Sequence, residues 1–144
     1  MIAGVLKETF PGERRVALVP AHMKSLQKAG LEILVEHGAG IAAGFPDESY
    51  QEKEARLASR EEIFQQADIL LQVRAGAANP EEGEKDLPAL RSGQFVIAHC
   101  DPLTDPAAIQ KMAEKGVSVF ALELLPRITR AQSMDVLSSM ATIA

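Results

Sequence analysis

Short apolar runs alternate with polar or amphipathic stretches along the chain. Five runs have the length of buried strands, and they occupy residues 2–6, 31–37, 68–74, 94–100 and 117–123. Helix signals stand between them: a Pro20 start with a Gly30 stop, a Pro46 start, the capping box SREE at 59–62, and an Asp105-Pro106 start with a Gly116 stop. This order predicts an α/β fold with a mainly parallel open sheet flanked by helices, a Rossmann- or flavodoxin-like three-layer sandwich.

The stretch AGAANPEEGEKDLPAL, residues 75–90, is polar and is interpreted as a long loop. Parallel sheets bind ligands beyond the carboxyl ends of their strands. Candidate chemistry is therefore expected in the segments that follow the predicted strands, which are residues 7–15, 37–44, 74–80, 99–105 and 124–135.

Composition narrows the function classes. The chain has 144 residues, which fits one domain, and a formal net charge of -5, which disfavours a nucleic-acid partner. Cys100 is the single cysteine, so an internal disulfide is excluded and a reducing compartment is favoured. No apolar run reaches the roughly 20 residues that span a bilayer, and the first residues lack a secretion-signal pattern. These features predict a cytoplasmic location, with membrane contact only through partners.

The motif HGAGIAAG follows a predicted strand and is similar to the glycine fingerprint of dinucleotide-binding domains, with Gly38, Gly40 and Gly44 in place. That fingerprint needs its last glycine inside the next helix, so that the helix amino end faces a pyrophosphate. Here Phe45 and Pro46 intervene before the helix begins. A flexible turn is therefore the favoured interpretation.

Three side chains at predicted strand ends form a possible anion-binding cleft: Arg15, Arg74 and His99. A planar guanidinium suits a carboxylate or a phosphate, and a histidine at a strand end is placed for acid–base chemistry. Solvated arginines and a packed histidine are the structural alternatives, and the pattern leaves both open. No metal site is predicted, because His99, Cys100 and Asp101 are adjacent and point in different directions along a strand.

The closing stretch is rich in amide and hydroxyl groups. Arg127, Arg130 and Gln132 are predicted on a loop, and Asp135, Ser138 and Ser139 fall within one helical turn after it. Such groups at a helix amino end can recognise a ring that carries a carboxamide, because a carboxamide both donates and accepts. A simple helix cap with solvated flanks explains the pattern equally well.

Three motifs carry a resemblance to a known family. KETFPGERRVALVP, VEHGAG and LELLPRITRAQSMDVLSSMA resemble the amino-terminal part of the NAD-binding alpha subunit of proton-translocating nicotinamide nucleotide transhydrogenase. Alanine dehydrogenase shares that fold and the opening motif, whereas the string RAQSMD is specific to the transhydrogenase branch. The resemblance implies an enzyme in which hydride passes between NAD(H) on this subunit and NADP(H) on a partner domain, coupled to proton movement through a membrane domain.

The same resemblance implies roles for residues of the closing stretch. Gln132 and Asp135 are the implied catalytic residues, with Gln132 reaching toward the interface where the two nicotinamide rings meet. The implied NAD(H) contacts and the wall of the site are Arg127, Ile128, Thr129, Gln132, Ser133, Met134, Asp135 and Ser138.

The resemblance also implies an organisation. Residues 1–126 are expected to form the amino-terminal α/β domain, and residues 127–144 the nucleotide-site loop and the start of a connecting helix, truncated before the NAD-binding Rossmann domain. A last helix of the family returns to complete the first domain. The full NAD subunit is expected to be a homodimer, peripheral to the inner membrane through its membrane-domain and NADP-domain partners. This chain alone is expected to be inactive and to bind NADH weakly.

Two alternatives remain open. An alanine dehydrogenase amino-terminal domain would use an arginine and a histidine matching Arg15 and His99 for a keto acid, with lysine where this chain has Arg74. A stand-alone, non-enzymatic α/β binding module, such as a signalling receiver, would need an acidic pair where this chain has Lys7 and Glu8.

Overall fold

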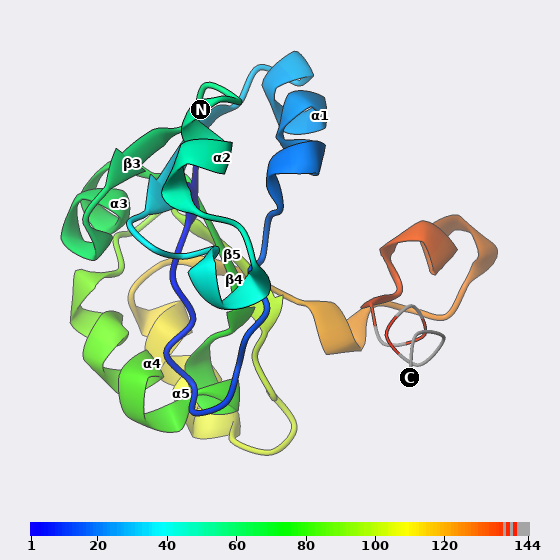
Figure 1. The fold of residues 1–144 in the computed structure, drawn as a ribbon. Coiled ribbons are helices and arrows are strands. Elements are labelled where there is room, and N and C mark those ends of the chain that lie inside the picture. The colour runs from blue at the N-terminus through cyan, green and yellow to red at the C-terminus, as the bar shows by residue number, and fades with distance from the viewer. Residues whose placement is uncertain (137, 139, 141–144) are drawn as a thin grey trace.

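One sheet of parallel strands forms the centre of the molecule (Figure 1). The structure is a computed structural model, and it describes residues 1–136, 138 and 140. In this part of the chain the sheet has the order β3-β2-β1-β4-β5-β6, and its strands are β1 Ile2–Val5, β2 Glu32–Glu36, β3 Arg56–Ala58, β4 Ile69–Arg74, β5 Phe95–His99 and β6 Ser118–Ala121. Every neighbouring pair is parallel, which confirms the predicted α/β fold.

Short helices connect the strands. The α-helices are α1 Met23–Lys28, α2 Asp47–Gln51, α3 Arg60–Gln66, α4 Pro80–Asp86 and α5 Pro106–Glu114. The 3-10 helices are η1 Pro20–His22, η2 Ile41–Ala43, η3 Gly76–Ala78, η4 Leu87–Ala89, η5 Leu122–Leu124 and η6 Thr129–Met134. The chain adds β2 and β3 on one side of β1 and β4 to β6 on the other, so the strand order reverses between β1 and β4. Open α/β sheets bind ligands at such a reversal.

The two faces of the sheet bury separate apolar clusters, because successive strand residues point to opposite faces. One cluster joins the sheet to α3, η4 and α5, and includes Leu34, Ile63, Phe64, Leu70, Val96 and Met112. The other joins it to α1 and α2, and includes Val5, Met23, Ile33, Val35 and Tyr50. The predicted three-layer arrangement of helices, sheet and helices is therefore confirmed.

The interpretation of residues 75–90 as one long loop is wrong. This stretch folds as η3, α4 and η4, with Pro80 in the first turn of α4. None of the residues of α4 is buried, so the helix carries no apolar stripe that the sequence could reveal. Close packing holds it instead: a Cβ on Gly83 would lie 2.7 Å from the carbonyl oxygen of Gly76.

Smaller differences concern lengths. β3 was not predicted, because three residues are too short for a clear alternation. The last strand ends at Ala121, and the following residues turn into η5. The predicted loop that holds Arg130 and Gln132 is the 3-10 helix η6.

Candidate functional site

A partly buried carboxylate, Glu8, lies beyond the ends of β1 and β4. The β4–β5 register shifts between Leu71 and Arg74, and the β1–β4 pairing ends at Val5 and Leu71. Beyond that point, Glu8 accepts the backbone N–H groups of Val73 at 2.6 Å and of Arg74 at 3.1 Å. Its carboxylate thus replaces the missing strand partner, and burial raises the pKa of Glu8.

A second carboxylate, Glu13, joins the two arginines of the predicted cleft. It accepts from Arg15 Nε at 2.7 Å and Nη2 at 2.6 Å, and from Arg74 Nε at 3.1 Å. The hydrogen bonds from Arg15 are the main reason why the pKa of Glu13 is lowered to about 2. Glu13 in turn raises the pKa of Arg15.

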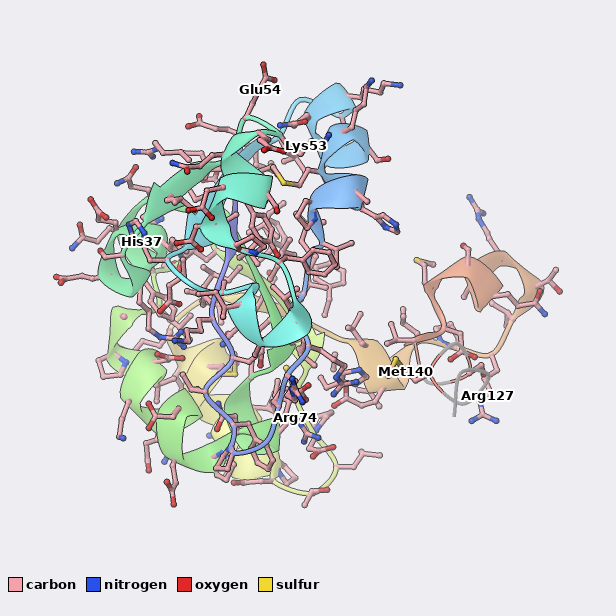
Figure 2. All side chains as sticks on the ribbon, viewed as in Figure 1. His37, Lys53, Glu54, Arg74, Arg127 and Met140 are labelled. Atoms are coloured by element: carbon pink, nitrogen blue, oxygen red, sulfur yellow. The ribbon has the colours of Figure 1, made fainter. Side chains whose placement is uncertain are left out.

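The structure brings Arg15, Arg74 and His99 to one cleft of 430 Å³, which Asp101 and Glu123 also line. The guanidinium of Arg74 stacks over the ring of Phe10, 4.4 Å from the ring centre. Figure 2 shows Arg74 within the body of the molecule. Anion binding here stays a prediction, and the carboxylate of Glu13 already occupies donors of both arginines.

Glu123 is a site residue that the sequence did not indicate, because it lay inside a predicted strand. In the structure it belongs to η5, where its side chain is 17% exposed, and its Oε2 lies 3.6 Å from Nδ1 of His99. Its place as the last residue of the predicted strand 117–123 was the available signal.

The three glycines of HGAGIAAG have structural tasks. Gly38 has a φ of +72° and donates its N–H to Asp47 Oδ1 at 2.8 Å. A Cβ on Gly40 would lie 2.7 Å from the hydroxyl oxygen of Tyr50, and Gly44 ends η2 with a φ of +88°. The geometry agrees with the interpretation as a turn, although the turn is tightly packed and ordered by these contacts.

The closing stretch, residues 125–136, 138 and 140, is here called the arm. It projects from the body beyond η5 (Figure 1), and Figure 2 shows Arg127 and Met140 on it. All implied nucleotide-contacting residues of η6 are exposed, whereas Ala131 is buried. Val136 and Met140 line an open groove of 370 Å³ together with Arg15 and His99.

Asp135 makes the contacts of a helix cap. Its carboxylate accepts the N–H of Ser138 at 2.9 Å and the hydroxyl of Ser138 at 2.5 Å. These contacts fit the cap alternative, and they leave the implied nucleotide role of both residues a prediction. Ser139 lies outside the described residues.

The described residues give no support to three further features: a metal site, a membrane-spanning helix and a reactive thiol. Among residues 1–136, 138 and 140, no group of three or more His, Cys, Asp or Glu side chains is arranged to hold a metal ion. In the same described part of the chain, no helix is long and apolar enough to cross a bilayer. Burial raises the pKa of the Cys100 thiol to about 12, so thiolate chemistry is disfavoured.

The Glu13 ion pairs should make the free energy of unfolding depend on pH in the acidic range. Because the pKa of Glu13 falls from 4.5 to about 2 on folding, its contribution is complete above about pH 4.5 and is lost as the pH falls to about 2. Urea unfolding of wild type and Glu13→Gln at several pH values should show a stability difference that shrinks across this window. Glu32→Gln is the control, since its partner Arg56 is 3.9 Å away and both side chains are exposed. A Glu13→Gln difference that stays constant from pH 7 to 2 would contradict the ion-pair account.

Comparison with known proteins adds the family. The family model described as "Alanine dehydrogenase/PNT, N-terminal domain" matches residues 4–144. NAD(P) transhydrogenase subunit alpha of Cereibacter sphaeroides is 42% identical over 145 aligned residues, which cover 100% of this chain and 27% of that protein. A transhydrogenase crystal structure from Sinorhizobium meliloti superposes with a TM-score of 0.91 and 40% identity, over 99% of this chain and 41% of the solved one.

An L-alanine dehydrogenase structure, at 24% identity, shares the fold with a TM-score of 0.85 over 100% of this chain and 38% of its own. The chain thus spans well under half the length of these proteins. Three findings agree with one another: the family match over nearly the whole chain, the parallel six-stranded sheet, and the 42% identity to a transhydrogenase subunit along the whole of this chain. The chain belongs to the alanine dehydrogenase/transhydrogenase amino-terminal domain family.

Proposed function

We propose that this chain is the amino-terminal part of the NAD(H)-binding alpha subunit of a proton-translocating NAD(P) transhydrogenase. In this role, residues 1–126 form the α/β domain, and residues 127–144 supply one wall of the nucleotide site and the start of the connecting helix. The observation that carries the proposal is the arm. Its string RAQSMD covers η6 from Arg130 onward and the residue that follows, all exposed or half-exposed except Ala131, in a chain 42% identical to such a subunit.

The side chains of the arm fit the nicotinamide end of NAD(H). Gln132 offers an exposed amide that can donate and accept at once, and Ser133 adds a hydroxyl. Ile128 and Met134 are 55% and 51% exposed, so they offer apolar surface to a flat ring. When bound, the nicotinamide ring supplies the hydride that the reaction transfers. The arm binds and orients that ring, with Arg127, Thr129, Asp135 and Ser138 as further contacts.

The remaining partners follow from the same role. NADP(H) is carried by a separate NADP-binding domain, a membrane domain moves the proton, and the complete alpha subunit acts as a homodimer. The location is the cytoplasmic side of the inner membrane, reached through these partners.

Exposed aromatic side chains on one face of the sheet support the proposal that this chain is part of a larger subunit. Phe95 and Phe120 lie on the face opposite α3 and α5, are 37% and 55% exposed, and have ring centres 6.1 Å apart. Parallel sheets are normally covered on both faces. We therefore assign this face to contact with the remainder of the alpha subunit, of which the last helix implied by the resemblance is the candidate.

An alanine dehydrogenase domain is the second candidate. The cleft that joins Arg15, Arg74 and His99 favours it. The bidentate hold of Glu13 on Arg15, at 2.7 and 2.6 Å, argues against it, because a keto-acid carboxylate would have to displace this contact.

The two candidates predict different reactions of the complete subunit. We expect no oxidation of alanine with NAD, and we expect hydride transfer from NADH to an NADP analogue once the NADP-binding domain is added. Absorbance of the reduced nucleotides follows both reactions. Rapid alanine-dependent reduction of NAD would contradict the transhydrogenase assignment. The NADP-binding domain without the alpha subunit is the blank.

A further inference from the structure

The arm is tied to the body at its root by one carboxylate. Glu123 is in η5, directly before the arm begins. Its Oε1 accepts the N–H of Cys100 at 2.8 Å and makes a second, short hydrogen bond with the N–H of Asp101. Both amides lie just past the end of β5, so the contact joins the segment after β6 to the segment after β5.

This tie continues the sheet beyond its last pair. The β5–β6 ladder ends where Ala98 faces Ala121, and no strand partner follows for the next amides in the described pairing. Glu123 supplies an acceptor there, as Glu8 does beyond β4. Asp101 has a φ of +47°, a left-handed conformation that is uncommon for non-glycine residues but that aspartate adopts more often than most. One carboxylate oxygen therefore holds two successive amides and the left-handed turn at Asp101.

The other oxygen of Glu123 makes no hydrogen bond within the described part of the chain. Oε2 is buried and lacks a hydrogen-bond partner among the described residues, and His99 Nδ1 stands 3.6 Å away, beyond hydrogen-bonding distance. A buried, unsatisfied oxygen destabilises a fold. Packing alone would be served better by an apolar side chain, so the hydrogen bonds that Oε1 accepts are the structural reason for a carboxylate at this position.

The arm has few other restraints of this kind. Its described backbone hydrogen bonds are local, from Ile128 to Pro126, Ala131 to Ile128 and Asp135 to Gln132. These bonds stabilise η6 itself, and they do not connect it to the body. The position of Gln132 then depends on the two places where the described arm meets the body: the groove that Val136 and Met140 line with Arg15 and His99, and the root, where Glu123 acts.

We infer that Glu123 is a positioning residue for hydride transfer: it holds the root of the arm against the end of β5, and so places Gln132 in the nucleotide site. This inference rests on the proposed function. Hydride transfer requires contact between two rings, and a misplacement of about 1 Å can slow such a step by about 100-fold. Affinity for NADH should fall less than the rate, because the proposed arm contacts, such as that of Asp135, are only part of the contacts that the nucleotide offers.

The test compares three variants of the complete alpha subunit, mixed with the NADP-binding domain. Glu123→Ala removes the acceptor and should slow single-turnover hydride transfer at least about tenfold, and by a larger factor than it raises the dissociation constant for NADH. Glu123→Gln keeps an oxygen that accepts from Cys100 and Asp101, so transfer should return to within about threefold of wild type.

Glu36→Ala is the matched control. Glu36 is a similarly buried carboxylate, 15% exposed, that accepts the N–H of Lys7 at 2.8 Å just past a strand end on the other side of the sheet. Its loss should reduce stability without slowing transfer. Three results would overturn the inference. The first is transfer at the wild-type rate in Glu123→Ala. The second is a Glu123→Gln variant as slow as Glu123→Ala, and the third is a Glu36→Ala variant as slow as Glu123→Ala. If Gln132→Asn still slows transfer in the first case, the proposed function stands; if it does not, both fail.

Discussion

Gln132→Asn in the complete alpha subunit should slow hydride transfer between NADH and an NADP analogue by at least about tenfold, equivalent to at least about 1.4 kcal/mol of barrier. Gln132 is exposed on η6, and in the role proposed above its amide donates and accepts between the two nicotinamide rings without placing a charge beside them. Asparagine keeps the amide and shortens its reach by one methylene. Because positioning controls such a transfer, the rate should fall while the dissociation constant for NADH changes little. Stopped-flow absorbance measures the first, and equilibrium titration the second.

Asp135→Asn is the companion variant, because it should weaken NADH binding, whereas Gln132→Asn should slow the transfer of hydride. Asparagine is as good a helix cap as aspartate, so the contacts with Ser138 are retained while the charge is removed. Loss of a charged acceptor should weaken NADH binding by about tenfold. If Gln132→Asn transfers hydride at the wild-type rate, the role proposed for the arm is wrong. The segment RITRAQSMD would then serve only as a helix cap.

Arg60→Ala should lower the free energy of unfolding of the chain by about 3–5 kcal/mol. Arg60 donates to both oxygens of Asp86 at 3.0 and 2.5 Å, to Glu36 at 2.9 Å and to the carbonyl oxygen of Lys7 at 3.1 Å. It therefore joins α3, α4, the end of β2 and the segment after β1. The side chains of Glu36 and Asp86 are only 15% and 17% exposed, so its removal leaves two mostly buried carboxylates without their cation.

Urea unfolding of the 144-residue chain measures the change. Arg56→Ala is the matched control. Arg56 is 51% exposed, and its contacts with Glu32 at 3.9 Å and with Gln66 Oε1 at 2.5 Å lie at the surface, so the substitution should change stability by less than about 0.5 kcal/mol. Equal effects of the two substitutions would mean that Arg60 is only one more surface charge. A partial recovery in Arg60→Lys is expected, because lysine restores the charge without the planar fork.

Local signals in the sequence predicted most of the elements. Ser59 caps α3 in a full capping box with Glu62, and Asp105 caps α5 through the N–H of Ala108, as their spacing indicates. The order of strands and helices predicted a parallel α/β sheet, since parallel neighbours need a crossover between them. By contrast, α4 is polar throughout, and its contact with the backbone of Gly76 and the 2.8 Å pair between Glu84 and Lys111 could not be seen in a local pattern.

The sequence by itself determined most of the elements, the fold class and the family resemblance, because these depend on residues a few positions apart or on whole motifs. It also placed Arg15, Arg74 and His99 at strand ends. Only the tertiary structure decided what these ends face. Strand order brings Arg74 to Glu13, 61 positions away, and Glu123 to Cys100, 23 positions away. Such partners are chosen by which strands become neighbours and where each ladder stops, and no short-range pattern of side chains carries that information.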